Sequence, residues 1–222
     1  MRIAAIETSG DWCSAALALG GEVRARGQRA GTRHSELALP MLEALLAEAG
    51  IAAAQLDAVA FGAGPGSFTG LRIACGIAQG LAFARDLPVL GIASFEAIAE
   101  ASGATRVAAC IDARMHEVYY AALEKQGGRW TEVVAGRCVP PAGVAPPPGD
   151  GWVGCGSGFA AFPDLLKGRL AATRAEVHPG AYEVAALAAP RLAAGEGLDA
   201  AQALPVYLRD KVAFTKEELA SR

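Results

Sequence analysis

The residues best suited to chemistry lie in a glycine-rich stretch, Gly62 to Gly70, which carries Ser67 and Thr69 among four glycines and a proline. The stretch follows an apolar, strand-like run and leads into a helical pattern. A glycine-rich turn before a helix presents free backbone N–H groups, which can hold a phosphate or another anion. The stretch has neither the lysine of a P-loop nor the register of a dinucleotide-binding fingerprint. Its spacing is therefore compatible with a phosphate loop or with a tight turn that serves only the fold.

Two carboxylates end strand-like runs at matching places in the two halves of the chain. Glu7 closes the first run, and Asp112 closes the run that starts the second half. Carboxylates at such strand ends can hold a metal-bound nucleotide, although polar residues also end strands for purely structural reasons. The candidate site is a phosphate site that has lost its activity, made of Glu7, Thr8, Ser9, Gly64, Gly66, Ser67 and Asp112. After Asp112 the chain reads Ala-Arg-Met-His instead of a glycine-rich turn, which argues against nucleotide hydrolysis.

The histidines, cysteines and serines give no catalytic or metal-binding pattern. The sequence has three histidines and five cysteines, with no C-x-x-C, no H-E-x-x-H and no helical pair of histidines. We interpret the cysteines as reduced core thiols. We interpret His34 as a loop residue, Ser35 as the cap of the next helix and Ser67 as a cap instead of a nucleophile. The sequence therefore predicts no catalytic residue, no metal and no cofactor.

The order of strand-like and helical patterns predicts an α/β fold built from a duplicated unit. Of the 222 residues, 53% are apolar, which is enough for a substantial core. The first unit reads βββαβαβα and forms a domain over residues 1–102. The second unit, over residues 103–222, is a trimmed copy, with a C-terminal segment that can return to the first domain. A proline-rich linker from Val139 to Gly149 stands where the copy should have a helix.

The expected elements follow from the hydrophobic periodicity of each segment. We expect strands at 2–8, 12–19, 22–28, 57–61, 88–92, 107–111, 116–124, 130–135, 152–153 and 204–208. We expect helices at 38–49, 71–85, 95–101, 160–166 and 181–194. The first of these helices is expected to start near Ala38, because Pro40 is tolerated best in a first turn.

The two helical patterns on either side of the glycine-rich stretch are apolar on more than one side. In the second, Gly76 and Gly80 lie one turn apart, and a glycine costs about 1 kcal/mol inside a helix, so it needs a packing reason. The first has a core-facing stripe of Leu39, Leu42 and Leu46 and further apolar residues beside it. Either another subunit covers these faces or the helices are wholly internal. If another subunit covers these faces, the interface residues are Leu37, Met41, Phe68, Ile73, Ala74, Ile77 and Ala78.

The charge pattern and the hydropathy exclude two classes of partner for the chain alone. The formal net charge is −3, from 20 basic and 23 acidic residues that are scattered along the chain, which argues against a nucleic-acid-binding surface. No uncharged apolar run approaches the ~18 residues of a membrane span, and the chain begins with a strand-like run instead of a leader. We therefore expect a cytoplasmic protein with no membrane contact.

Several segments together resemble the TsaB family, the dimerisation subunit of the bacterial tRNA threonylcarbamoyladenosine machinery. They are Ile6–Ser9, Arg33–Glu36, Gly62–Ile73, Gln79–Ala82, Ile111–Arg114 with Glu117–Tyr119, and Pro205–Arg209, and the resemblance extends from residue 1 to about 216. It implies a fold of the actin-like ATPase and ribonuclease H-like type, with two related subdomains around a cleft. One departure is Glu7, because the family usually has an aspartate there.

The resemblance also implies a pseudo-enzyme that supports a catalytic partner. That partner would be a TsaD-like subunit, which transfers the threonylcarbamoyl group to a tRNA adenosine, and a TsaE-like ATPase would complete the assembly. The chain would dock through the helices of its first subdomain and form a homodimer through the same surface when alone. It would meet tRNA only through the complex. The alternatives are a nucleotide-binding phosphotransferase that uses Glu7, Asp112 and the glycine-rich stretch, and a peptidase.

Overall fold

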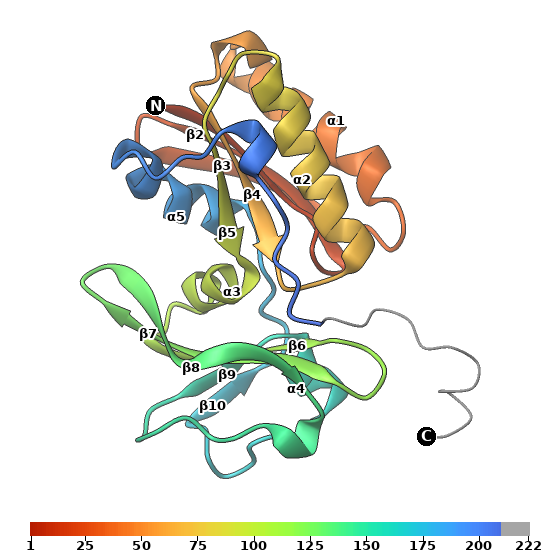
Figure 1. The fold of residues 1–222 in the computed structure, drawn as a ribbon, viewed down its shortest axis with the longest axis vertical. Coiled ribbons are helices and arrows are strands. Elements are labelled where there is room, and N and C mark those ends of the chain that lie inside the picture. The colour runs from red at the N-terminus through yellow and green to blue at the C-terminus, as the bar shows by residue number, and fades with distance from the viewer. Residues whose placement is uncertain (210–222) are drawn as a thin grey trace.

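The computed structural model describes residues 1–209, which form two five-stranded mixed sheets with helices around them (Figure 1). The end of the expected second domain, residues 210–222, lies outside the described residues. The first sheet has the order β3-β2-β1-β4-β5. Its strands are β1 (Arg2–Glu7), β2 (Trp12–Leu19), β3 (Glu22–Arg29), β4 (Ala58–Gly64) and β5 (Val89–Ala93). β1 runs antiparallel to β2 and parallel to β4, because a tight turn follows β1 whereas α1 crosses over before β4.

The second sheet repeats this plan with the order β10-β9-β6-β7-β8. Its strands are β6 (Arg106–Asp112), β7 (Val118–Gln126), β8 (Arg129–Val139), β9 (Val153–Cys155) and β10 (Ala172–Arg174). Again the first three strands form an antiparallel meander and the fourth joins the first in parallel. Glu7 and Asp112 end the equivalent strands β1 and β6. The predicted α/β fold built from a duplicated unit is therefore confirmed.

The helices sort by the face of the sheet that they cover. α1 (His34–Ala49) and α2 (Phe68–Phe83) lie side by side over one face of the first sheet, and α5 (Ala181–Ala193) covers the other (Figure 1). Because side chains alternate between the two faces of β1, this strand contributes to the core on each side of the sheet. Ala4 and Ile6 face α1 and α2, whereas Ile3 and Ala5 face α5. α3 (Ser94–Ser102) lies between the two sheets, where Phe95 and Ile98 join the core of the second sheet.

The second subdomain is trimmed, as expected. Between β8 and β9 the chain has only the 3-10 turn η2 (Pro141–Gly143), and α4 (Ser157–Ala161) is a helix of five residues. Two further 3-10 turns, η1 (Ala53–Gln55) and η3 (Ala200–Gln202), belong to the first subdomain. After β10 the chain crosses back, so that α5 packs on β1 and β2.

The structure differs from the expected elements at several places, and four of these differences have a clear local reason. α1 begins at His34 instead of Ala38, because Pro40 lies on the exposed side and water can bond the carbonyl that its missing N–H leaves free. α4 ends before Phe162 because Pro163 follows it. Residues 204–208 form no strand, since their only backbone bond to a strand is from the Val206 N–H to β4. The exposed three-residue strand β10 was missed because it is too short to show periodicity.

The five cysteines are free thiols; Cys138 is half-buried and the other four are buried, as the sequence predicted. Among the described residues, no helix is long and apolar enough to cross a membrane.

Candidate functional site

A cleft of about 950 Å³ separates the two subdomains and holds part of the predicted phosphate site. Ser9, Gly66 and Ser67 line it from the first subdomain, and Asp112 lines it from the second. Glu7, Thr8 and Gly64 do not reach it, because they are buried behind the wall. The structure therefore divides the seven predicted residues into a group that faces the cleft and a group that supports its wall.

The glycine-rich loop after β4 is filled by the chain's own backbone. A Cβ on Gly70 would lie 1.9 Å from the Thr8 carbonyl oxygen, and a Cβ on Gly66 would lie 2.5 Å from the Ser9 carbonyl oxygen. The Thr8 hydroxyl donates to the Gly70 carbonyl at 2.7 Å, and the Ser67 N–H donates to the Ser9 carbonyl at 2.7 Å. These glycines are thus required for close approach of two backbone segments.

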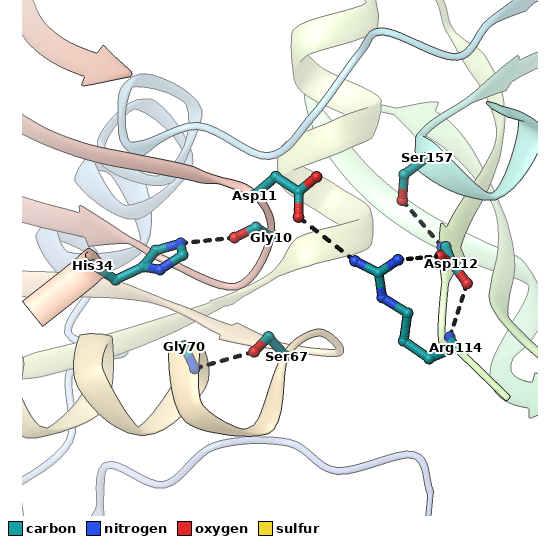
Figure 2. A network of polar contacts seen from close by, with 8 residues as sticks. All are labelled: Gly10, Asp11, His34, Ser67, Gly70, Asp112, Arg114 and Ser157. Atoms are coloured by element: carbon teal, nitrogen blue, oxygen red, sulfur yellow. Dashed lines mark hydrogen bonds and ion pairs between the residues drawn. The ribbon is translucent and has the colours of Figure 1, made fainter. Parts of the chain in front are cut away.

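Ser67 is the N-cap of α2, as predicted, and its Oγ accepts the Gly70 N–H at 3.4 Å (Figure 2). Gly64 has a φ of 115°, and a Cβ there would lie 2.6 Å from the carbonyl oxygen of Val206. The N–H groups of Ser67 and Gly70 and the space beside the glycines are therefore taken up by contacts within the chain, as in a structural turn.

Glu7 is enclosed beneath this loop and does not present a carboxylate to the cleft. Its side chain is fully buried, and a Cβ on Gly62 would lie 1.8 Å from its Oε2. Oε1 accepts the Ser9 N–H, whereas Oε2 has no hydrogen-bond partner within residues 1–209. Burial raises the pKa of the Glu7 carboxyl, an effect that the hydrogen bonds from Ser9 and Thr8 oppose. An enclosed carboxyl whose charged form is disfavoured by burial is unsuited to hold Mg²⁺ or to activate water.

Asp112 faces the cleft, but its carboxylate forms an ion pair with Arg114 of the same chain. Oδ2 lies 3.1 Å from Arg114 Nη1, and Oδ1 accepts the Arg114 N–H at 2.8 Å (Figure 2). The same guanidinium extends across the cleft to Asp11, at 3.8 Å. The Asp112 N–H donates to Ser157 Oγ at 3.1 Å. The carboxylate is therefore neutralised within the chain, and no group of three or more His, Cys, Asp or Glu in residues 1–209 is arranged to bind a metal ion.

His34 does not lie in a loop, contrary to the expectation. It is the first residue of α1, it is buried, and its Nε2 lies 2.8 Å from the Gly10 carbonyl oxygen (Figure 2). Ser35 is exposed and makes no capping bond, because Arg33 is the N-cap residue. His34 thus fixes the β1–β2 turn against α1, which is a structural role.

Sequence reasoning missed three features of the cleft. They are the bridging side chain Arg114, the basic residue Arg209 at one end, and a parallel stack of Trp12 on His178 with ring centroids 4.4 Å apart. Apart from Asp112, which lies two residues from Arg114, their partners are far away along the chain, so no local spacing pattern could reveal these contacts.

A second candidate surface is the outward face of α1 and α2. Phe68 and Phe83 are 39% and 59% exposed at the two ends of α2, and Ile73 and Ile77 are half-buried between them. On α1, Leu37 and Met41 are likewise half-buried beside the core. We call this apolar surface the α1–α2 face. Because these side chains are exposed in part, the alternative of wholly internal helices is wrong.

Gly76 and Gly80 lie on the same face, with open space around them. A Cβ at either position would meet nothing within 4 Å. The close packing contact that we expected to explain these two glycines is therefore not found within residues 1–209. A helix that carries two exposed glycines is destabilised by about 1 kcal/mol at each, with no compensating contact in this chain.

Three predictions about these helices need correction. Ala74 and Ala78 are fully buried against the chain's own sheet, because they lie on the inner side of α2, and they have no surface to offer a partner. Leu39 is 40% exposed instead of facing the core, because the inner stripe of α1 consists of Ala38, Leu42, Leu45 and Leu46.

Comparisons with known proteins give a consistent family. A family model described as "TsaD: tRNA N6-adenosine threonylcarbamoyltransferase" matches residues 27–216. The TsaB protein of Escherichia coli (strain K12), a tRNA threonylcarbamoyladenosine biosynthesis protein, is 38% identical over 97% of this chain and 98% of its own. TsaB of Haemophilus influenzae is 35% identical over 97% of each.

Solved structures agree in fold. The chain is similar to a Pseudomonas aeruginosa structure described as an uncharacterized protein with similarity to peptidase YEAZ. The TM-score is 0.88 and the identity 41%, with 94% of this chain and 99% of that chain covered. A second structure, described as YeaZ from Pseudomonas aeruginosa, gives a TM-score of 0.87 at 41% identity, with 93% and 99% covered.

Proposed function

This chain belongs to the TsaB family of tRNA threonylcarbamoyladenosine biosynthesis proteins, and on that premise we propose that it is a non-catalytic subunit that docks through its α1–α2 face. The observation that carries the proposal is the pair Gly76 and Gly80, exposed in open space on an apolar helix face. Glycine at such positions is unfavourable in the chain alone and becomes useful when a second backbone approaches closely. The interface comprises Leu37, Met41, Phe68, Ile73 and Ile77.

The cleft supports the non-catalytic part of the proposal. A phosphotransferase needs an accessible carboxylate for its metal, whereas Glu7 is enclosed and Asp112 is paired with Arg114. A peptidase needs an activated nucleophile or a metal-bound water, and Ser67 instead caps a helix. These contacts support neither a phosphotransferase nor a peptidase.

The partner that we propose is a TsaD-like catalytic subunit, with a TsaE-like ATPase completing the assembly and tRNA reached only through the complex. The family model that carries the transferase description matches most of this chain, which indicates that such a subunit shares the fold. A related subunit would present an equivalent pair of helices. The same face can then pair with a second copy of this chain when the partner is absent, since a self-complementary face gives a two-fold dimer.

The test uses Ile77→Glu, with Val133→Glu as the matched control. Ile77 is half-buried on the α1–α2 face, whereas Val133 is 39% exposed on β8 of the other subdomain. A charge in an apolar interface is costly, so Ile77→Glu should weaken binding to the TsaD-like subunit by at least about tenfold, or 1.4 kcal/mol, and should abolish the homodimer. The control should bind normally. Tight binding by a folded Ile77→Glu variant would contradict the proposal.

A further inference from the structure

The segment Ala203–Arg209, called the strap from here on, leaves the first subdomain beside α2 and passes to the second subdomain (Figure 1). Its first residue is fixed because the Ala203 carbonyl accepts the Gln79 Nε2–H at 2.9 Å. Farther along, the Val206 N–H donates to the Ala63 carbonyl of β4 at 2.7 Å. The strap is thus attached to the first subdomain through its backbone, on both a helix and a strand.

Tyr207 adds a side-chain attachment to the same helix. Its hydroxyl accepts the Arg72 Nε–H at 3.2 Å, and its ring lies 5.6 Å from the Phe68 ring, centroid to centroid. The Arg72 guanidinium in turn lies 3.6 Å above the Phe68 ring. These contacts hold the strap along the first turns of α2, up to the point where it crosses the cleft.

Arg209 attaches the far end of the strap to the second subdomain. Its guanidinium pairs with Glu117, donates to the Arg114 carbonyl at 3.4 Å, and lies 5.9 Å from the Tyr119 ring centroid. The side chains of Arg209 and Glu117 are only 13% and 22% exposed. By contrast, Arg114 and Asp11 are 76% and 74% exposed and 3.8 Å apart, so that pair is screened by water. The strap pair is therefore the firmer ionic tie across this side of the cleft.

The turn that Arg209 contacts has an unusual backbone. Arg114, Met115 and His116 have φ values of 62°, 54° and 58°, so three consecutive L-residues adopt the left-handed conformation. Non-glycine residues rarely adopt this conformation, and they retain it only where their surroundings enforce it. The Glu117 N–H donates back to the Arg114 carbonyl at 3.0 Å. Arg209 contacts both residues that this bond joins, since it pairs with the side-chain carboxylate of Glu117 and donates to the carbonyl of Arg114.

We propose that the strap is a built-in clamp: it ties the first subdomain to the β6–β7 turn and holds that turn in its left-handed conformation. A consequence is that Arg114 stays directed into the cleft, where it neutralises Asp112 and approaches Asp11. The clamp therefore keeps the cleft occupied by a side chain of its own protein. This inference rests on contacts within one chain and does not depend on docking at the α1–α2 face, although Phe68 belongs to that face and also contacts the strap.

The test is amide hydrogen exchange in the full chain, followed at the Glu117 N–H and the Arg114 N–H. Arg209→Ala removes the clamp, and the matched control is Arg137→Ala, an exposed arginine on β8 with no ion pair within residues 1–209. We expect exchange at both amides to accelerate by about tenfold or more in Arg209→Ala and to stay within about twofold of wild type in the control. Unchanged exchange in a folded Arg209→Ala variant would overturn the proposal.

A second pair of variants keeps the proposal testable if Arg209→Ala fails to fold. Glu117→Gln removes the charge at the other end of the ion pair with almost no change of shape, and it should accelerate exchange at the same amides. Val206→Pro deletes the N–H that bonds Ala63, far from the turn. Because the strap acts as one connection, this variant should also accelerate exchange at Glu117, by about threefold. Normal exchange in both variants would show that the turn is held without the strap.

Discussion

Replacing Gly76 and Gly80 by alanine should change stability and association in opposite directions. Each alanine adds a Cβ where nothing lies within 4 Å in the chain alone, so the substitution meets no steric conflict there. It also removes the conformational freedom that glycine has in the unfolded chain. In the proposed complex the same positions are covered by a partner backbone, and the added methyl groups then have no room.

The magnitudes follow from the helix position. Glycine to alanine inside a helix stabilises by about 1 kcal/mol per site, so the double variant gains about 2 kcal/mol. For a chain of this length each kcal/mol raises the Tm by roughly 2–4 °C, which gives a rise of roughly 4–8 °C. Overpacking a well-fitted interface costs about 1–3 kcal/mol, which weakens the Kd by roughly 5- to 150-fold.

The assay combines thermal unfolding of the isolated chain with titration of a TsaD-like subunit. Unfolding is measured at a concentration too low for self-association, because a bound second copy would itself raise the Tm. Gly10→Ala serves as the control, since a Cβ there also meets nothing within 4 Å but lies at the cleft. The control should bind the partner normally. A double variant that is more stable and also binds with unchanged affinity would refute the reasoning from exposed glycines.

Three further predictions concern buried and paired groups. Burial raises the pKa of Glu7 in the folded chain, so its contribution to stability is present below pH 4.5 and is lost as the pH rises through the folded pKa. Glu7→Gln should therefore become more stable relative to wild type with rising pH, by about 1.4 kcal/mol per unit inside that window, and a difference independent of pH in urea titrations would contradict this. The pKa of Asp57 is lowered to about 2 by its hydrogen bond with Arg2, so stability should fall between about pH 4 and pH 2, and this fall should be smaller in Asp57→Ala. In a thiol-reagent assay at neutral pH, half-buried Cys138 should react first, and the other four should react only on unfolding; several equally fast thiols would contradict the buried placement.

The sequence was sufficient for the plan of the fold because its signals are local. The tight turn between the expected strands 12–19 and 22–28, the repeat of three strands in the second half and the Ser67 cap each depend on a few neighbouring residues, and the structure has all three. The start of α1 at His34 could not be predicted from neighbouring residues. It depends on which side of α1 Pro40 lies, and that side is fixed only when the helix packs on the sheet.

The candidate site was less predictable, because tertiary contacts decide its chemistry. The spacing was compatible with a phosphate loop or with a structural turn, and only the fold shows that Gly66 and Gly70 leave room for the backbone of Ser9 and Thr8. Spacing also placed Glu7 at a strand end, but only the fold shows that the loop encloses it. The alternation of the strap resembles a strand, yet Pro205 lacks an N–H and only the Val206 N–H bonds to the sheet.

The most direct test of the docking face is hydroxyl-radical footprinting of the chain with and without a TsaD-like subunit. Phe68 and Phe83 are exposed on α2 in the isolated chain, whereas Tyr182, 50% exposed on α5, provides an internal reference on the opposite side of the sheet. We predict that binding protects Phe68, Phe83 and Met41 from oxidation and leaves Tyr182 unchanged. Protection of Tyr182 with continued oxidation of Phe68 and Phe83 would contradict the account.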